Sequence, residues 1–150
     1  MKKFRFSLHT VHQLRERAQA AAEAELARAN GEVAQAIETL AAATQARENA
    51  MNTYTQMLLS GRISQAETTL RAAYLVVLAE RIAEAQQNLA ERERRREIVR
   101  QQVITATTRA EATATLRDQQ LAAHRAEAAR EEQEQLDEIA TLRAARHRLS

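Results

Sequence analysis

The sequence predicts an all-α fold in which two long helices form an antiparallel coiled-coil hairpin with an overhanging C-terminal helical arm. Ala, Glu, Lys, Leu and Arg make up 88 of the 150 residues, above the roughly one-half share that is typical of coiled coils and long helices. Leu, Ile, Val and Phe number only 29, too few to fill a globular core. With 0 Pro and 2 Gly, the chain also lacks the turns that a sheet protein needs every ~8 to 12 residues.

The charge is balanced, with 22 basic and 20 acidic side chains, which favours a folded helical protein over a disordered one. The pI of 9.5 follows from the Arg content and does not indicate a basic face, so no nucleic-acid partner is expected. The absence of Cys excludes disulfides and thiolate metal sites. The longest apolar run, Ala72 to Ala79, is too short to span a bilayer, and the start has no signal-peptide pattern. We therefore expect a cytoplasmic protein without a membrane span.

The first helix is expected from about residue 4 to 59. From Val33 onward, apolar and semi-apolar residues alternate in steps of four and three, which is the pattern of a heptad seam. The members of this seam are Val33, Ile37, Leu40, Thr44, Arg47, Met51, Tyr54 and Leu58. The same stripe continues upstream through Leu8, Val11, Ala18, Ala22, Leu26 and Ala29. Gly61 ends the helix, because glycine takes the left-handed conformation without penalty.

A turn at about residues 60 to 63 leads to a second helix at about 64 to 147, and we expect residues 1–150 to form a single coiled-coil domain. Ser64 and Glu67 have the S-x-x-E spacing of a capping box. The stripe of the second helix runs through Leu75, Leu78, Ile82, Ala85, Leu89, Arg92, Arg96, Val99, Val103, Ala106 and Ala110. It weakens through Leu121 and Ala128 and returns at Leu136, Ile139 and Leu142.

The short connection folds the two helices back on each other, so that residues whose numbers sum to about 122 should face one another. Ile37 then lies opposite Ala85, Val33 lies opposite Leu89, and Leu8 lies near residue 114. About 35 residues at the C-terminus remain without a partner within the chain, given the unequal helix lengths. We expect the free protein to be a monomer.

The sequence contains no pattern of a catalytic or metal site. His9 and His12 could share a helix face, but no third ligand is near. The acidic residues near the C-terminus lack the pocket that general acid catalysis requires; they are Glu131, Glu132, Glu134, Asp137 and Glu138. No phosphate-binding loop occurs. We therefore expect no enzymatic activity, no catalytic residue, no metal and no cofactor.

Four aromatic residues and an arginine-rich segment admit two interpretations each. Phe4 and Phe6 either pack locally onto the first turns of the helix or form a binding surface. Tyr54 and Tyr74, near the hairpin turn, either fill the seam or form a docking surface with neighbouring apolar side chains. The segment 91–97 places arginines on the seam, where their aliphatic stems either cover a narrow core or form a nucleic-acid patch. The low net charge and the few aromatic residues disfavour the nucleic-acid patch.

Three motifs resemble the flagellar FliJ family. The start, Phe4-Arg5-Phe6-Ser7-Leu8 followed by Val11, Leu14, Arg15 and Glu16, is similar to the F-x-F-x-L-x-x-V-L-x-L-R-E start of that family, with His12 in place of the usual Leu. Tyr74-Leu75 and Leu78 resemble its Y-L-x-x-L motif, and Leu136-Asp137-Glu138 with Ala140 resembles its L-D-E-x-A motif. The resemblance extends over the whole chain, including its length and hairpin position.

The resemblance implies a non-enzymatic stalk and coupling factor of flagellar type III protein export, at the inner membrane of the flagellar base. Its implied partners are the hexameric flagellar export ATPase, the membrane export gate protein and export chaperones, for which it would act as an escort. The ATPase would bind one end of the hairpin, at Phe4, Phe6, Leu8, Leu14, Arg15, Leu136, Asp137, Glu138 and Arg143. The export gate would bind the other end, at Met51, Tyr54, Leu58, Tyr74 and Leu75.

Two further functions remain compatible with this architecture. One is the stalk of a virulence type III secretion system, which the F-x-F-x-L start disfavours. The other is a purely structural coiled-coil scaffold, which binding to a hexameric ATPase would exclude.

Overall fold

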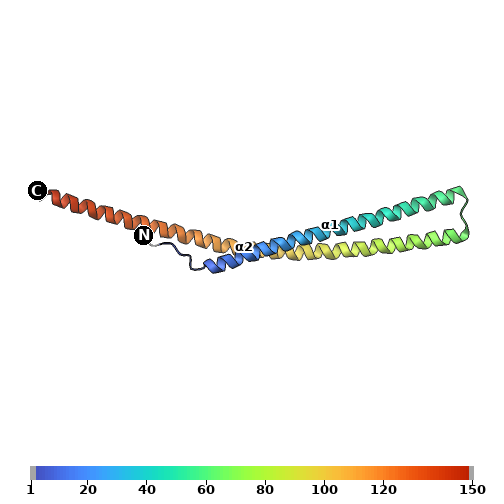
Figure 1. Cartoon of the computed structure of the whole chain (residues 1–150), viewed down its shortest axis with the longest axis horizontal. Helices are drawn as coiled ribbons and strands as arrows, with labels where there is room; N and C mark the ends of the chain where they lie inside the picture. Colours follow the sequence, from blue (N-terminus) through green and yellow to red (C-terminus); the bar gives the residue numbers. More distant parts are fainter. Residues whose placement is uncertain (1–2, 149–150) are drawn as a thin grey trace. The chain divides into compact units, whose positions relative to one another are not determined.

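The computed structural model describes residues 3–148, which form two helices: α1 (His9–Ser60) and α2 (Gln65–Arg148) (Figure 1). No strand occurs among these residues, so the predicted all-α fold with two long packed helices is confirmed. Residues 1, 2, 149 and 150 of the predicted domain lie outside the described part. The chain divides into two compact units. The terminal unit combines the residues up to Ala20 with those from Thr105 onward, and the hairpin unit is Ala21–Ile104.

The turn of the hairpin unit has the two sequence signals that were expected there. Gly61 has a φ of 66°, and its N–H donates to the Leu58 carbonyl at 3.2 Å. The Ser64 N–H donates to Glu67 Oε2 at 3.1 Å, and the Glu67 N–H donates to Ser64 Oγ at 3.2 Å. These reciprocal bonds form the predicted capping box, which satisfies two N–H groups that have no partner in the helix itself.

Helix α1 begins at His9, later than the predicted start near residue 4. Phe4 and Phe6 lie in a non-helical segment, and their rings contact the imidazoles of His124 and His12, respectively. In a helix, residues i and i+2 point to nearly opposite sides, whereas in an extended segment they share one side. Both Phe rings therefore reach inward-facing histidines only if the segment stays extended.

The stripe predicted for α2 is correct, because all of its members from Leu75 to Ala110 are buried or half-buried. The seam predicted for α1 from Val33 to Leu58 is right at three of its eight positions and wrong at five. Val33, Leu40 and Tyr54 face inward, but Arg47 is exposed and the other positions of the structural seam lie one residue earlier than predicted. The exposed predicted members are Ile37, Thr44, Met51 and Leu58, and the residues that replace them are Ala36, Ala43, Ala50 and Met57.

This shift has a packing reason. Small residues at a helix interface allow the two backbones to approach closely, and α1 offers alanine at three of the four shifted positions. Ile37 is left 51% exposed next to the buried Ala36. The apolar face of α1 is therefore a stripe of alanines, which a search for large apolar residues does not detect.

Ion pairs join the two helices of the hairpin unit along the edge of this seam. Glu32 Oε2 accepts from Arg92 Nη1 at 2.7 Å and lies 3.6 Å from Arg95 Nη1. Glu25 pairs with Arg95 at 3.2 Å and with Arg28 at 2.6 Å. The sequence predicted that arginine stems cover the core, and Arg92 is half-buried, but its carboxylate partner was not predicted.

In the terminal unit, α1 packs on α2 about one helical turn away from the predicted register. The prediction placed Leu8 near residue 114, whereas the structure places His12 against Thr113. Leu8, Val11 and Ala18, which were predicted to lie on the seam, are exposed. His12 occupies the inward position that the apolar pattern had assigned to its neighbour Val11.

Helix α2 continues beyond its contacts with α1 as a C-terminal arm. Half-buried residues occur up to Ala128, and every described residue from 129 to 148 is exposed. The arm that the rest of the chain does not cover is therefore shorter than the roughly 35 residues that the sequence predicted, because the N-terminal segment contacts α2 at His124. No helix in the described part of the chain is both long and apolar enough to cross a membrane.

Candidate protein-binding surfaces

An aromatic cluster lies at the N-terminal end of the terminal unit. The Phe4 ring lies edge-on to the His124 ring, with centroids 5.6 Å apart, and the Phe6 ring lies edge-on to the His12 ring at 6.4 Å. Both Phe side chains are half-buried. The rings thus tie the non-helical N-terminal segment to both helices while keeping part of their apolar surface exposed.

His12 and Thr113 form a polar contact in the interior of the same unit. Their side chains are buried, and His12 Nδ1 lies 2.8 Å from Thr113 Oγ1. Thr113 Oγ1 donates its single proton to the Ala110 carbonyl at 2.9 Å, so Nδ1 must donate to Thr113. His12 Nε2 lies 3.1 Å from Glu16 Oε1, in a geometry that makes no hydrogen bond. The Thr113 hydroxyl therefore links the His12 ring to the α2 backbone through two hydrogen bonds.

Arg15 and Leu14 extend this surface along α1. Arg15 is half-buried, and its Nη1 donates to the Arg109 carbonyl at 3.1 Å, which joins α1 to α2. Leu14 points away from this contact and is 58% exposed. Arg15 thus has a structural role within the unit, while Leu14 and Leu8 expose apolar surface.

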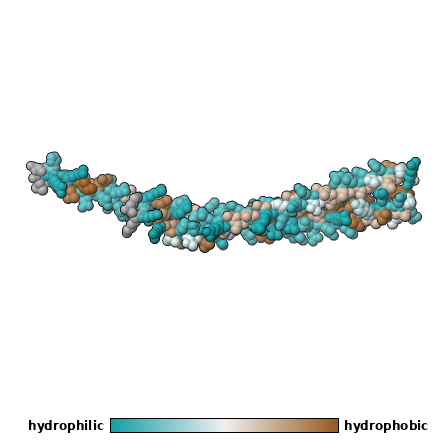
Figure 2. All heavy atoms as spheres, viewed as in Figure 1, coloured by the Kyte–Doolittle hydropathy of each residue, from teal (hydrophilic) through white to brown (hydrophobic). Residues whose placement is uncertain are grey.

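The predicted C-terminal site residues lie on the arm of α2. Leu136, Ile139 and Leu142 are exposed large apolar residues on this arm, and Figure 2 shows apolar atoms interrupting its polar surface. Asp137 accepts from Gln133 Nε2 at 2.9 Å, and Glu138 and Arg143 are exposed. The structure does not bring these residues into contact with Phe4 or Phe6.

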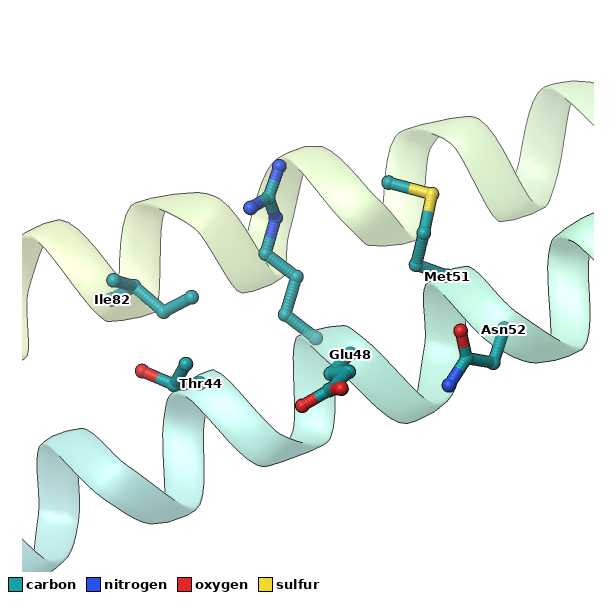
Figure 3. A pocket seen from close by; sticks show the side chains of 6 residues that line it. Thr44, Glu48, Met51, Asn52 and Ile82 are labelled. Carbon is teal, nitrogen blue, oxygen red and sulfur yellow. The ribbon is translucent and has the colours of Figure 1, made fainter.

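A shallow groove of about 300 Å³ lies between α1 and α2 in the hairpin unit. Thr44, Glu48, Met51 and Asn52 line it from α1, and Ile82 lines it from α2 (Figure 3). Its sixth lining residue is Arg47. The groove therefore combines the apolar side chains of Met51 and Ile82 with one cationic group, Arg47, and one anionic group, Glu48. It lies where the α1 seam has no large inward-facing residue.

The remaining predicted residues of the hairpin unit differ in their exposure. Tyr54 and Leu75 are half-buried, whereas Tyr74 is 50% exposed and Leu58 is 47% exposed. Together with Met51, which is 39% exposed, they leave apolar and aromatic surface close to the turn. Of these residues, tyrosine is the type that most often carries binding energy at protein interfaces.

A metal site on either surface would require several ligand side chains close together. Within residues 3–148, no group of three or more His, Cys, Asp or Glu side chains is placed to hold a metal ion. His9, the second predicted ligand candidate, is exposed, while His12 is committed to Thr113. The side chains that these surfaces expose are apolar, aromatic and charged.

The sequence did not predict the roles of His12, Thr113 and His124. Two polar residues that face each other across the helices predict a buried hydrogen bond. They can be matched only when the register of α1 against α2 is known. With the predicted register, His12 faced residue 110 rather than Thr113, so the two polar residues were not matched.

A family model described as flagellar FliJ protein matches residues 4–149. The match therefore covers both helices, the hairpin turn and the C-terminal arm. Comparisons with curated proteins and with solved structures found no match.

Proposed function

This chain belongs to the flagellar FliJ family, and we propose that it is a non-enzymatic stalk and coupling factor of flagellar type III export. Family membership makes the chain a component of the flagellar type III export apparatus. The observation that carries the finer proposal is the family match over residues 4–149 on a two-helix hairpin. In this proposal the hairpin acts in the apparatus by binding other proteins.

The proposed ATPase-binding surface is on the terminal unit. It combines Leu8 and Leu14 of α1 with the aromatic cluster of Phe4 and Phe6 and, on the arm, with Leu136, Asp137, Glu138 and Arg143. The exposed Leu14 supplies an apolar anchor, and the charged residues of the arm supply groups for ion pairs with a hexameric ATPase. Arg15 contributes mainly by holding α1 on α2, since its guanidinium is bound to the Arg109 carbonyl.

The proposed export-gate surface is on the hairpin unit. The groove beside Met51 and Ile82 accepts an apolar side chain of a partner, and the exposed Tyr74 and Leu58 extend the contact toward the turn. Arg47 and Glu48 at the groove offer a group of each charge for ion pairs with a partner segment. Export chaperones are a second class of partner for this unit, in keeping with an escort role at the cytoplasmic side of the inner membrane.

The proposal is tested by titrating the purified full chain into the hexameric flagellar export ATPase. We expect saturable binding and an increase in ATP hydrolysis, while the chain alone hydrolyses no ATP. Absence of binding at micromolar concentrations would contradict the stalk function and leave the scaffold function.

A matched pair of variants makes the test specific. Leu14→Ala removes an exposed apolar side chain and should weaken ATPase binding by about tenfold, in line with the loss of an interface anchor. Gln13→Ala, at an exposed neighbouring position, should leave the affinity unchanged. Circular dichroism of both variants should match that of the natural sequence, because neither side chain is buried.

A further inference from the structure

We propose that the C-terminal arm of α2 is a self-association surface, on which a second copy of the chain binds in antiparallel orientation about a two-fold axis at Ile139. This inference goes beyond the binding of the ATPase and the gate, and it replaces the sequence-based expectation that the free chain is a monomer. Because Leu136 also belongs to the proposed ATPase-binding surface, the second copy and the ATPase would bind the arm alternately. It rests on the exposure of the arm and on the order of apolar and charged residues along it.

The arm has an apolar face that the chain itself does not cover. All described residues from 129 to 148 are exposed, and Leu136, Ile139 and Leu142 are 61%, 47% and 58% exposed. A shallow groove lies beside Ile139 and Leu142, with Arg143 and Arg146 on its other sides. An exposed apolar face flanked by charged residues is the usual form of a helix that binds another helix.

The charges of the arm are divided between its two halves. The segment 131–138 contains five acidic residues and no basic residue, and the segment 139–148 contains three arginines and His147 and no acidic residue. A parallel second copy would bring like charges together. An antiparallel copy brings the acidic half of each chain against the basic half of the other.

The apolar and charged positions agree on one register. Leu136 and Leu142 lie three residues before and after Ile139, and Glu132 and Arg146 lie seven residues before and after it. Steps of three and seven residues stay on one face of a helix. With Ile139 on the axis, Leu136 of one copy meets Leu142 of the other, and Glu132 meets Arg146. This self-complementarity is what a two-fold interface requires, and it is the reason to assign a second copy to this face rather than an unrelated partner.

Cysteine cross-linking tests the register, because the natural chain contains no cysteine. In the purified full chain, Ile139→Cys should form an intermolecular disulfide at least tenfold faster than Thr141→Cys, whose side chain is on the opposite side of the arm. A mixture of Leu136→Cys and Leu142→Cys chains should cross-link mainly between the two variants. Equal rates for Ile139→Cys and Thr141→Cys, or cross-linking mainly between identical variants, would overturn the antiparallel arrangement.

Charge reversal tests the complementarity independently. Glu132→Arg or Arg146→Glu alone should weaken self-association by roughly tenfold, measured by sedimentation equilibrium at low salt, because two pairs per dimer become repulsive. An equimolar mixture of the two single variants should associate at least as tightly as the natural chain, because every pair is again of opposite charge. The proposal would be overturned if the mixture did not recover the self-association of the natural chain, or if the natural chain were monomeric at every concentration. The apolar face of the arm would then bind another partner. Neither experiment contains the ATPase, so its failure leaves the proposed function untouched.

Discussion

The hairpin unit and the terminal unit are held together by different interactions, although the same two helices build both. In the hairpin unit, every buried residue is apolar: Ala29, Val33, Ala36, Leu78, Ala85 and Val99. In the described part of the terminal unit, the buried residues are His12, Ala110 and Thr113. The difference indicates that the hairpin unit gains stability mainly from apolar burial, whereas the terminal unit depends on a directional hydrogen bond.

This difference has a consequence for the register of the helices. A stripe of alanines can slide with a small loss of contact, but a buried hydrogen bond is lost completely if the register changes. His12 and Thr113 therefore fix the position of α1 on α2 in the terminal unit. In the hairpin unit, the ion pairs of Glu25 and Glu32 and the packing of Leu78 serve the same purpose.

The largest effect is expected in the apolar core of the hairpin unit. Leu78 is 2% exposed, whereas Leu70 on the same helix is 71% exposed. Leu78→Ala should lower the free energy of unfolding by about 2 to 5 kcal/mol, the range for buried leucines. Leu70→Ala should change it by less than about 0.5 kcal/mol. Urea denaturation followed by circular dichroism measures both, and equal midpoints would show that the seam is wrongly assigned.

The next effect is expected at the polar contact of the terminal unit. Thr113→Val should cost about 1 to 3 kcal/mol, because it leaves the buried Nδ1–H of His12 without an acceptor. Adding His12→Leu to this variant should recover most of the loss, because both partners are then apolar. A double-mutant cycle with urea denaturation measures the coupling. Strictly additive effects would contradict a hydrogen bond between the two side chains.

The two glycines of the hairpin unit should respond in opposite directions. Gly61 has a φ of 66°, so Gly61→Ala should destabilise the protein by about 1 to 2 kcal/mol. Gly31 lies inside α1 and an added methyl group would meet nothing within 4 Å. Gly31→Ala should therefore stabilise the protein by up to about 1 kcal/mol. A melting temperature that falls in both variants would contradict this assignment of the turn and the helix.

The smallest effect is expected for the ion pairs between the helices. Glu32 and Arg92 are about one-third exposed, so Glu32→Gln should cost less than about 1 kcal/mol. This loss of unfolding free energy should become smaller as salt is added, because ions screen exposed charges. The exposed Glu84 provides the control, since Glu84→Gln should have little effect. A large loss for Glu32→Gln that does not depend on salt would indicate a packing role instead.

The sequence predicted those parts of the fold that depend on local signals. The glycine at the turn, the capping box of Ser64 and Glu67, and the stripe of α2 all appear in the structure as expected. The seam of α2 is marked by apolar residues that recur every three or four positions, as Leu75, Leu78 and Ile82 do.

The sequence did not predict the features that depend on contacts between distant residues. In α1, alanines occupy both inward and outward positions, so Ile37 was taken for a seam residue in place of Ala36. The extended segment before His9 depends on the contacts of Phe4 and Phe6 with histidines, and the ring of His124 is far away in the sequence. The roles of the predicted binding residues depend on partners and remain predictions.

The central claim is that the two units carry separate binding surfaces, and one paired titration tests it most directly. Leu14→Ala in the terminal unit and Tyr74→Ala in the hairpin unit are each titrated against the purified ATPase hexamer and against the purified export gate protein. We expect Leu14→Ala to weaken ATPase binding by about tenfold with unchanged gate binding, and Tyr74→Ala to show the reverse. If Tyr74→Ala abolished ATPase binding while Leu14→Ala kept full affinity for the hexamer, the assignment of the two surfaces would be contradicted.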